Sequence, residues 1–303
     1  MNLKVDIAGV VLSNPVVTAS GTFGFGEEYG AFYDIAKLGG VCVKGLTLRP
    51  RQGNPPPRIA ETPAGILNSV GLQNPGVQYY VRHELPRLKK AGVTVIANIS
   101  GNTIEEYCEM AKIVSASDTD LVEMNISCPN VKEGGVAFGT NPRTVAEITG
   151  AVKRCCRKPL IVKLSPNVTD ITQTARAAEE SGADALSLIN TITGMAIDIH
   201  TRRPVLHNNV GGLSGPAVKP VAVRMVWQAA QAVRIPIIGM GGIATGEDAI
   251  EFMLAGARAV AVGTAQFVQP TAAMDVLGGI RAYCEKYGVD DVNSLVGGVH
   301  IHG

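Results

Sequence analysis

The sequence has little net charge, few cysteines and no long uncharged apolar run. Its 27 Lys and Arg balance 26 Asp and Glu, so it lacks the positive excess of proteins that bind nucleic acid or anionic membranes. No apolar stretch approaches the roughly 18–20 residues needed to cross a bilayer. The first ten residues carry Asp6 and show no signal-peptide pattern. We therefore expect a cytoplasmic protein, with neither nucleic acid nor membrane as a partner.

Residue patterns that bind metals or form disulfide scaffolds are also missing. Six cysteines are too few and too scattered for a disulfide scaffold in 303 residues. The sequence contains no CxxC, no HExxH and no paired Cys and His at ligand spacing. We therefore expect no metal site in this chain. The 46% hydrophobic and 17% charged residues exclude a disordered chain.

Short apolar runs recur along the chain, most of them ending in Gly, Ser or Asn. The eight runs are 16–20, 40–45, 93–99, 121–127, 160–165, 185–190, 235–242 and 259–264. Most are nearly continuous, as expected of parallel strands covered on both faces. Segments with helical periodicity lie between them. They include Leu85 and Leu88, and the ranges 104–114, 144–155, 171–180, 217–233 and 248–254.

Alternating strands and helices predict parallel pairing through right-handed crossovers. Eight such units in about 300 residues favour an α/β fold, a (β/α)8 TIM barrel that forms a single domain over residues 1–303. An open doubly wound sheet is the alternative. Two connections, 46–92 and 191–216, are longer than a minimal crossover. Long loops after barrel strands commonly carry binding and catalytic residues.

Glycines follow the last two predicted strands, in 239–243 (GMGGI) and 262–264 (VGT). Such segments let backbone N–H groups approach an anion, and many barrels hold a phosphate there. The glycines could also serve tight turning alone. Gly239, Gly241 and Ala244 match a dinucleotide-binding spacing, but the expected acidic residue is missing and the strand is the seventh. We therefore do not expect NAD at this spot.

Two lysines interrupt otherwise apolar runs, Lys44 in VCVKG and Lys163 in LIVKLS. Burying an ammonium is costly unless an anionic or strongly accepting partner meets it. A phosphate, an electron-rich cofactor or a substrate carboxylate would serve. Either lysine alone could instead reach water from a strand tip. Both are expected at the same barrel mouth, which favours an anionic ligand.

Cys128 follows the fourth predicted strand, between Ser127 and Pro129, and is expected on a stiff loop at the barrel mouth. A free thiol has a pKa near 8.5, so it accepts protons well only where a cation or dipole helps. The alternative for any single cysteine is a buried inert thiol. That is how we interpret Cys42, Cys108, Cys155, Cys156 and Cys284.

Asparagines recur at the same end of the predicted barrel. They are Asn68, Asn98, Asn125 and Asn190. A side-chain amide offers two donors and an acceptor, which suits a planar ring that bears C=O and N–H groups. Each could instead serve a turn, but three of them close predicted strands. Together they predict a polar, uncharged, ring-shaped ligand.

The segments NISCPN followed by VKEGG, ASGTFGFG, VKGLTLRPR, LNSVGLQNPG, VKLSPN, INT and GMGGI…AVGT resemble one family, in its order and over about residues 1–300. The chain is similar to class 1 dihydroorotate dehydrogenases, and more specifically to the catalytic subunit of the NAD-linked 1B type. The resemblance implies an FMN-containing barrel that oxidises (S)-dihydroorotate to orotate in pyrimidine (UMP) biosynthesis.

The resemblance also implies roles for individual residues. Cys128 falls on the base that removes the C5 proton, while a hydride passes from C6 to flavin N5. The positions that contact FMN are Ser20, Lys44, Gly45, Asn98, Asn125, Lys163, Ile189, Gly215, Gly241, Gly242, Gly263 and Thr264. The positions that contact substrate are Lys44, Asn68, Ser69, Val70, Gly71, Leu72, Asn125, Asn190 and Thr191.

The residue at position 128 helps to distinguish the classes of dihydroorotate dehydrogenase. Membrane-bound class 2 enzymes would have Ser there and an N-terminal membrane-associating extension. The fumarate-using 1A type also has Cys, and here the continuation VKEGGVAFG and the compact N-terminus resemble 1B. The resemblance then implies a partner subunit with FAD and a [2Fe–2S] cluster, with two copies of each chain.

Other functions stay open at this stage. They are the 1A enzyme, a flavin subunit of the dihydropyrimidine dehydrogenase type, a phosphate-binding barrel without catalysis, and an aldolase or synthase. In the last of these, Lys163 would form a Schiff base.

Overall fold

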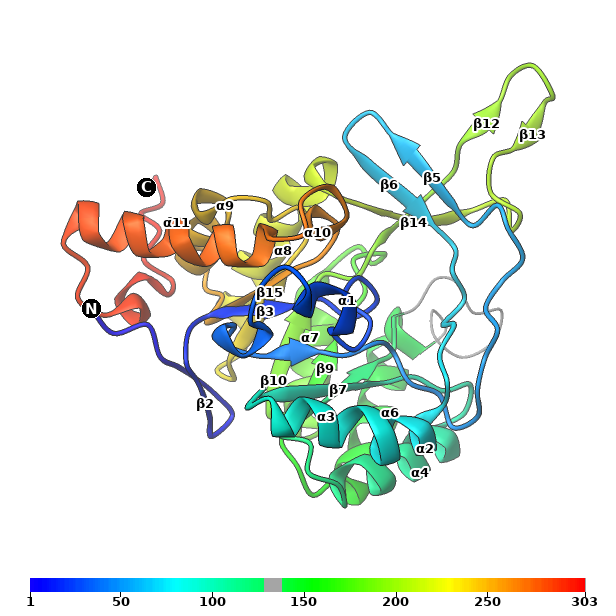
Figure 1. Cartoon of the computed structure of the whole chain (residues 1–303), viewed down its shortest axis with the longest axis horizontal. Helices are drawn as coiled ribbons and strands as arrows, with labels where there is room; N and C mark the ends of the chain where they lie inside the picture. The colour runs from blue at the N-terminus through cyan, green and yellow to red at the C-terminus, as the bar shows by residue number, and fades with distance from the viewer. Residues whose placement is uncertain (128–137, 303) are drawn as a thin grey trace.

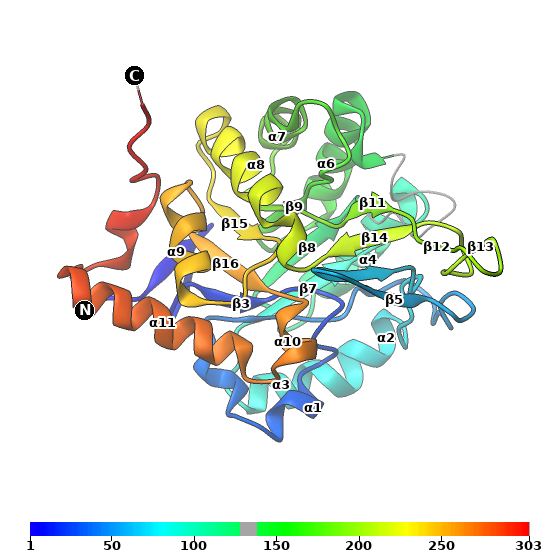
Figure 2. The same cartoon turned by 90° about the horizontal axis from the view of Figure 1, so that it is seen from above.

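Eight parallel strands form the centre of the molecule, with helices around them (Figures 1 and 2). The structure is a computed structural model that describes residues 1–127 and 138–302. The strands lie in the order β3-β16-β15-β10-β9-β8-β7-β4. Their bounds are β3 (Val16–Thr18), β4 (Val41–Cys42), β7 (Val95–Ile99), β8 (Leu121–Asn125), β9 (Leu160–Lys163), β10 (Ala185–Leu188), β15 (Ile237–Met240) and β16 (Ala259–Val262). Each lies inside a predicted strand.

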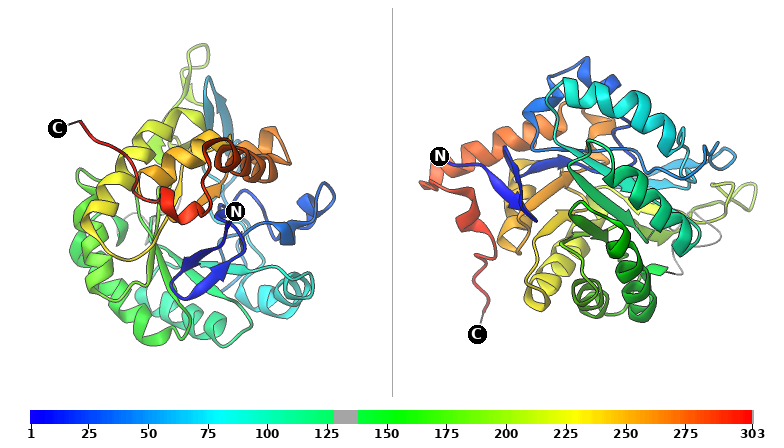
Figure 3. Two further views of the ribbon diagram at one scale, coloured as in Figure 1. Left: turned by 90° about the vertical axis from the view of Figure 1, so that its left-hand side faces the viewer. Right: turned by 90° about the horizontal axis from the view of Figure 1, so that it is seen from below.

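The two end strands of this order meet, which closes the barrel (Figure 3, left). Val17 and Gly40 form a parallel bridge between β3 and the start of β4. The Thr18 hydroxyl accepts a hydrogen bond from the Cys42 backbone N–H at 3.0 Å. All residues of β7, β8, β9 and β10 are buried, because helices cover one side and facing strands the other. The predicted (β/α)8 barrel is confirmed, and the open sheet is excluded.

Helices connect and cover the strands. Their bounds are α1 (Glu27–Gly30), α2 (Val77–Tyr79), α3 (Leu85–Lys90), α4 (Ile104–Ser115), α6 (Pro142–Cys155), α7 (Ile171–Glu180), α8 (Lys219–Ala232), α9 (Gly246–Leu254), α10 (Ala265–Val268) and α11 (Ala272–Tyr287). None of the helices in the described ranges has the length and apolar character of a membrane span.

The sequence reasoning missed α11, because Gly278 and Gly279 weaken the helical signal in its middle. The structure shows why a glycine is needed. A Cβ on Gly246 of α9 would lie 2.4 Å from backbone atoms of Gly279, so the two helices touch backbone to backbone. Gly279, one of the two glycines that obscure the helix in the sequence, therefore allows its packing.

A second, four-stranded sheet is built from the two long connections, in which the sequence analysis predicted no strands. It contains β5 (Ile59–Thr62), β6 (Gly65–Asn68), β11 (Ile192–Gly194) and β14 (Gly211–Ser214), in the order β11-β14-β6-β5. All its pairs are antiparallel. We call it the mouth sheet, because it lies by the carboxyl ends of the barrel strands (Figure 1).

Two short hairpins complete the described chain. The hairpin of β12 (Ile197–Asp198) and β13 (Arg203–Pro204) extends outward beyond the mouth sheet (Figure 1). The hairpin of β1 (Val5–Ile7) and β2 (Val10–Leu12) lies across the opposite end of the barrel (Figure 3, left). The open end is thus the one where the barrel strands finish.

Candidate active site

A cavity of about 760 Å³ lies between the carboxyl ends of the barrel strands and the mouth sheet. This volume is within the range of roughly 300–1,000 Å³ typical of small-molecule sites. Residues that follow β3, β4, β10, β15 and β16 line it from the barrel side, and residues of β5, β6 and β14 line it from above. The mouth sheet thus turns an open barrel end into a deep pocket.

Most of the predicted site residues meet in this cavity. Those that line it are Ser20, Lys44, Gly45, Asn68, Val70, Gly71, Leu72, Asn125, Lys163, Ile189, Asn190, Thr191, Gly215, Gly241, Gly242, Gly263 and Thr264. Ser69 and Asn98 are fully buried and are not part of the lining. Cys128 lies outside the described residues, so the structure does not place its thiol.

Glycines expose the backbone at the end of the cavity next to β15 and β16. Gly242 has φ +79°, and a Cβ there would lie 2.8 Å from Lys219 Cβ and 2.9 Å from the Gly215 carbonyl oxygen. Only glycine fits this conformation and this space without strain. Within the described ranges, the backbone N–H groups of Gly242, Gly263 and Thr264 donate to no protein acceptor. They are therefore available to an anion.

One carboxylate anchors the loop that carries Gly242. Asp248 Oδ2 accepts hydrogen bonds from the N–H groups of Ala244 and Thr245, both at 2.9 Å, and its Oδ1 pairs with Lys219 Nζ at 2.7 Å. Burial alone would raise the pKa of Asp248, but these hydrogen bonds outweigh it and lower the pKa below its ordinary value. Lys219 donates hydrogen bonds to Asp248 and to Glu251, and these bonds raise the pKa of Lys219. Asp248 thus fixes the loop from its outer side.

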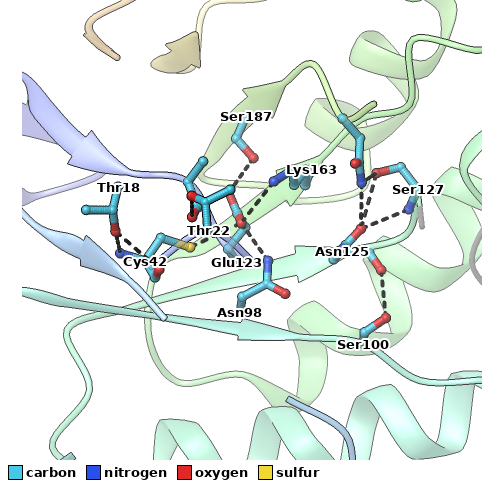
Figure 4. A network of polar contacts seen from close by, with 12 residues as sticks. Thr18, Thr22, Cys42, Asn98, Ser100, Glu123, Asn125, Ser127, Lys163 and Ser187 are labelled. Atoms are coloured by element: carbon cyan, nitrogen blue, oxygen red, sulfur yellow. Dashed lines mark hydrogen bonds and ion pairs between the residues drawn. The ribbon is translucent and has the colours of Figure 1, made fainter. Parts of the chain in front are cut away.

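A buried polar network lies beneath the cavity (Figure 4). At its centre is Glu123 of β8, whose side chain is 3% exposed. Glu123 accepts hydrogen bonds from Asn98 Nδ2 and Ser187 Oγ, both at 2.6 Å, and from Cys42 Sγ at 3.3 Å. Lys163 Nζ lies 3.9 Å from Glu123 Oε1. Burial and the nearby Glu123 raise the pKa of Cys42 well above its ordinary value, which favours the thiol over the reactive thiolate.

A second cluster joins the ends of β8 and β10 (Figure 4). Asn190 Nδ2 donates to Ser127 Oγ at 2.7 Å and to Asn125 Oδ1 at 3.2 Å. The backbone N–H and the hydroxyl of Ser127 both donate to Asn125 Oδ1 at 3.2 Å. Tyr107 donates its hydroxyl to the Asn125 carbonyl at 2.6 Å. Two of the predicted asparagines are therefore held together, next to the residue that precedes Cys128.

Asn68 reaches the cavity from the mouth sheet, where its Nδ2 donates to the Gly212 carbonyl at 3.3 Å. The predicted asparagines thus approach from two sides rather than from strand ends alone. Asn98 differs, because it points into the buried network.

Sequence reasoning missed three residues that support the site, Glu123, Asp248 and Lys219. Glu123 carried the same signal as Lys163, a charged residue inside an apolar run. Asp248 carried the signal of a capping box with Thr245, which the structure shows. No pattern in the sequence indicated that Lys219 would pair with Asp248 and Glu251.

Comparison with known proteins agrees with this geometry. A family model described as dihydroorotate dehydrogenase matches residues 2–283. The chain belongs to the dihydroorotate dehydrogenase family. It is 60% identical over 297 residues to a protein of Alkaliphilus metalliredigens, with 98% of each chain covered. It is 56% identical over 301 residues to one of Thermoanaerobacter pseudethanolicus, covering 99% of this chain and 100% of the relative.

Both relatives are named the catalytic subunit of dihydroorotate dehydrogenase B (NAD(+)). A protein of Desulforamulus reducens with the same name is 57% identical over 302 residues, with 99% of each chain covered. The resemblance to the NAD-linked type, stated from the sequence motifs, is confirmed.

Proposed function

We propose that this chain oxidises (S)-dihydroorotate to orotate in pyrimidine biosynthesis, with FMN as its bound cofactor. The observation that carries the proposal is the set of residues that line one cavity. A backbone cradle for an anion, the buried Lys163 and the paired Asn125 and Asn190 all face the same space. The names of the close relatives support the same reaction.

The cavity residues fit FMN. The N–H groups of Gly242, Gly263 and Thr264, which have no protein acceptor among the described residues, suit a phosphate, since backbone N–H groups in glycine-rich segments bind anions. Lys163 lines the same cavity, where its ammonium would stabilise negative charge on the flavin ring. The full set proposed to hold FMN is Ser20, Lys44, Gly45, Asn98, Asn125, Lys163, Ile189, Gly215, Gly241, Gly242, Gly263 and Thr264. When bound, FMN supplies the two-electron acceptor that the side chains lack.

The substrate is proposed to bind between the mouth sheet and the cluster of Asn125 and Asn190. Their amides match the C=O and N–H groups of the pyrimidine ring, and Lys44 suits the carboxylate. The full substrate set is Lys44, Asn68, Ser69, Val70, Gly71, Leu72, Asn125, Asn190 and Thr191. Ser69 is fully buried behind the residues that line the cavity, so its proposed contribution is to support them rather than to touch the substrate.

Cys128 is proposed to take the C5 proton of the substrate. Its neighbour Ser127 is fully buried and hydrogen-bonded to Asn125 and Asn190, so the chain enters position 128 from a fixed point beside the proposed substrate site. An ordinary thiol has a pKa of about 8.5, so flavin reduction should become faster as the pH rises toward that value.

Lys163 is poorly suited to the alternative Schiff-base chemistry. A nucleophilic lysine must be neutral, and desolvation or a nearby cation usually makes it so. Here the charged neighbour of Lys163 is an acid instead, because its Nζ lies 3.9 Å from the Glu123 carboxylate. The aldolase alternative is therefore not favoured.

The proposal includes a separate electron-transfer subunit. The relatives are named catalytic subunits of an NAD(+)-linked enzyme, and such a name implies another subunit. We propose that the partner carries FAD and a [2Fe–2S] cluster and passes electrons to NAD, in a cytoplasmic complex with two copies of each chain. Co-purification and the mass of the complex test this arrangement.

The decisive experiment is the absorbance spectrum of the purified chain before and after anaerobic addition of dihydroorotate. We expect flavin absorbance that dihydroorotate bleaches and dihydrouracil does not. Cys128→Ala should retain FMN and lose roughly 10²–10⁴-fold in the rate of bleaching, the usual contribution of a positioned base. A colourless protein would refute the cofactor, and normal bleaching in Cys128→Ala would refute the base.

A further inference from the structure

Five consecutive strands of the barrel each contribute one side chain to the network beneath the cavity (Figure 4). Cys42 comes from β4, Asn98 from β7, Glu123 from β8, Lys163 from β9 and Ser187 from β10. Cys42 and Ser187 belong to strands that do not pair with β8, so Glu123 reaches them across the barrel interior. The carboxylate is the common acceptor of all these contacts.

Hydrogen-bond donors and one lysine surround the Glu123 carboxylate. Its Oε1 receives the Asn98 amide N–H and its Oε2 the Ser187 hydroxyl, both at 2.6 Å. Such short bonds are typical of charge-assisted hydrogen bonds. The Lys163 ammonium, at 3.9 Å, supplies the opposite charge. An unpaired buried carboxylate would be strongly destabilising, whereas hydrogen bonds and a cation together allow one.

Glu123 also determines which way Asn98 points. Because the amide nitrogen of Asn98 donates to Glu123, its Oδ1 must face the other way. This oxygen is buried and has no hydrogen-bond partner among the described residues. It lies 2.9 Å from the position of a Cβ built on Gly45, which lines the cavity. An unpaired buried acceptor is thus aimed at the cavity wall.

We propose that Glu123 is a positioning residue for the flavin, which it never touches. As the counter-ion of Lys163 it holds that side chain at the cavity, turns the Asn98 acceptor toward the cavity, and offsets the positive charge at the flavin site. This inference rests on the proposed function, because it assigns a charge balance to the FMN site. It assigns Glu123 no part in proton transfer.

Glu123→Gln tests the charge while keeping the shape. A glutamine has the same size, can still accept from Asn98, and can donate its own N–H to the Ser187 hydroxyl. Lys163 would then lose its counter-ion. The probe is sulfite, which adds to oxidised flavins and places negative charge on the ring. We expect Glu123→Gln to bind sulfite at least tenfold more tightly, and to shift the flavin potential upward by about 30 mV for that tenfold change.

Ser187→Ala is the matched control, because it removes one hydrogen bond to Glu123 and leaves every charge in place. We expect its sulfite affinity to stay within about twofold of the parent chain. Unchanged sulfite affinity in flavin-loaded Glu123→Gln would overturn the proposal, and so would an equal change in Ser187→Ala. A parent chain that takes up no FMN would instead refute the proposed function.

A second measurement covers the case in which Glu123→Gln folds too poorly to hold flavin. Unfolding midpoints in denaturant are compared for Glu123→Gln, Lys163→Met and the double variant. Removing one member of a buried ion pair leaves an unpaired group, so the double variant should be less destabilised than the two single changes added together. Additive midpoints would show that the pair is not coupled and would overturn the proposal.

Discussion

Replacing Asp248 by Ala should loosen the end of the cavity that is proposed to bind the FMN phosphate, although Asp248 holds this end from outside the cavity. The change removes the carboxylate that accepts hydrogen bonds from the Ala244 and Thr245 N–H groups. It also removes one of the two carboxylates that pair with Lys219. Thr245 would keep its bond to the N–H of residue 248, so the helix still begins at the same place. The loop that carries Gly242 loses its main side-chain anchor.

The size of the effect follows from these contacts. Losing a helix-capping side chain costs about 0.5–2 kcal/mol. A partly exposed ion pair adds about 0–1 kcal/mol, and here the Lys219 side chain is 30% exposed. We therefore expect a loss of about 2 kcal/mol in the free energy of unfolding. With an unfolding entropy of roughly 2.1 cal/mol/K per residue, the 303-residue chain should melt about 3 °C lower.

The effect should also depend on pH in a defined direction. Hydrogen bonds lower the pKa of Asp248 in the folded chain, against the opposing effect of burial. An unfolded Asp has a pKa of about 3.9. The stabilisation from Asp248 is therefore fully present above about pH 4, and it is lost as the pH falls through the lower folded value. The stability gap between the parent chain and Asp248→Ala should narrow below about pH 4.

The assay is thermal unfolding followed by circular dichroism, together with FMN binding followed by flavin fluorescence. Glu251→Ala is the matched control, because it removes the other carboxylate on Lys219 without touching the loop. It should change the free energy of unfolding by less than about 1 kcal/mol and leave FMN affinity unchanged. Equal losses of unfolding free energy and of FMN affinity in Asp248→Ala and Glu251→Ala would refute the reasoning. A stability difference between the parent chain and Asp248→Ala that does not narrow below about pH 4 would also refute it.

Two further predictions concern single residues. Gly242→Ala should weaken FMN binding by at least tenfold in a fluorescence titration, because its Cβ would press on the Gly215 carbonyl at 2.9 Å. Gly92→Ala, with a similar φ of +78° and open space around the Cβ, should lower stability and leave FMN affinity unchanged; equal affinity losses would contradict this assignment. Burial, and then the Cys155 thiol, raise the pKa of Cys108 to about 11. Alkylation of Cys108, mapped by mass spectrometry, should therefore be slow near pH 8 and accelerate toward pH 11, whereas fast labelling at pH 8 would show an accessible thiolate.

The barrel could be predicted because each of its strands is a short apolar run, covered on both faces. The mouth sheet could not. β5 alternates exposed and half-buried residues, and β14 begins with two glycines, so neither resembles a buried strand. Their pairing also joins segments far apart in the chain, as the bond from Asn68 to Gly212 shows. A local sequence pattern cannot indicate a strand partner that lies so far away in the chain.

The candidate site was predictable where a residue type is unusual for its surroundings. Lys44 and Lys163 stood out as charges in apolar runs, and both line the cavity. Glu123 had the same signal, but its meaning depends on which strands face each other across the barrel. The orientation of Asn98 likewise follows from Glu123 and not from its own neighbours in sequence.

The mouth sheet has a consequence for how the protein acquires its pocket. β6 and β14 are separated by more than 140 residues, and four of the eight barrel strands, β7 to β10, lie between them. Joining their ends in an unstructured chain would close a very long loop at a high entropic cost, which the intervening strands remove once they have assembled. We therefore expect the mouth sheet, which forms the roof of the pocket, to pair only after these four strands have assembled. Newly made chains should become able to retain a ligand only after their core is complete.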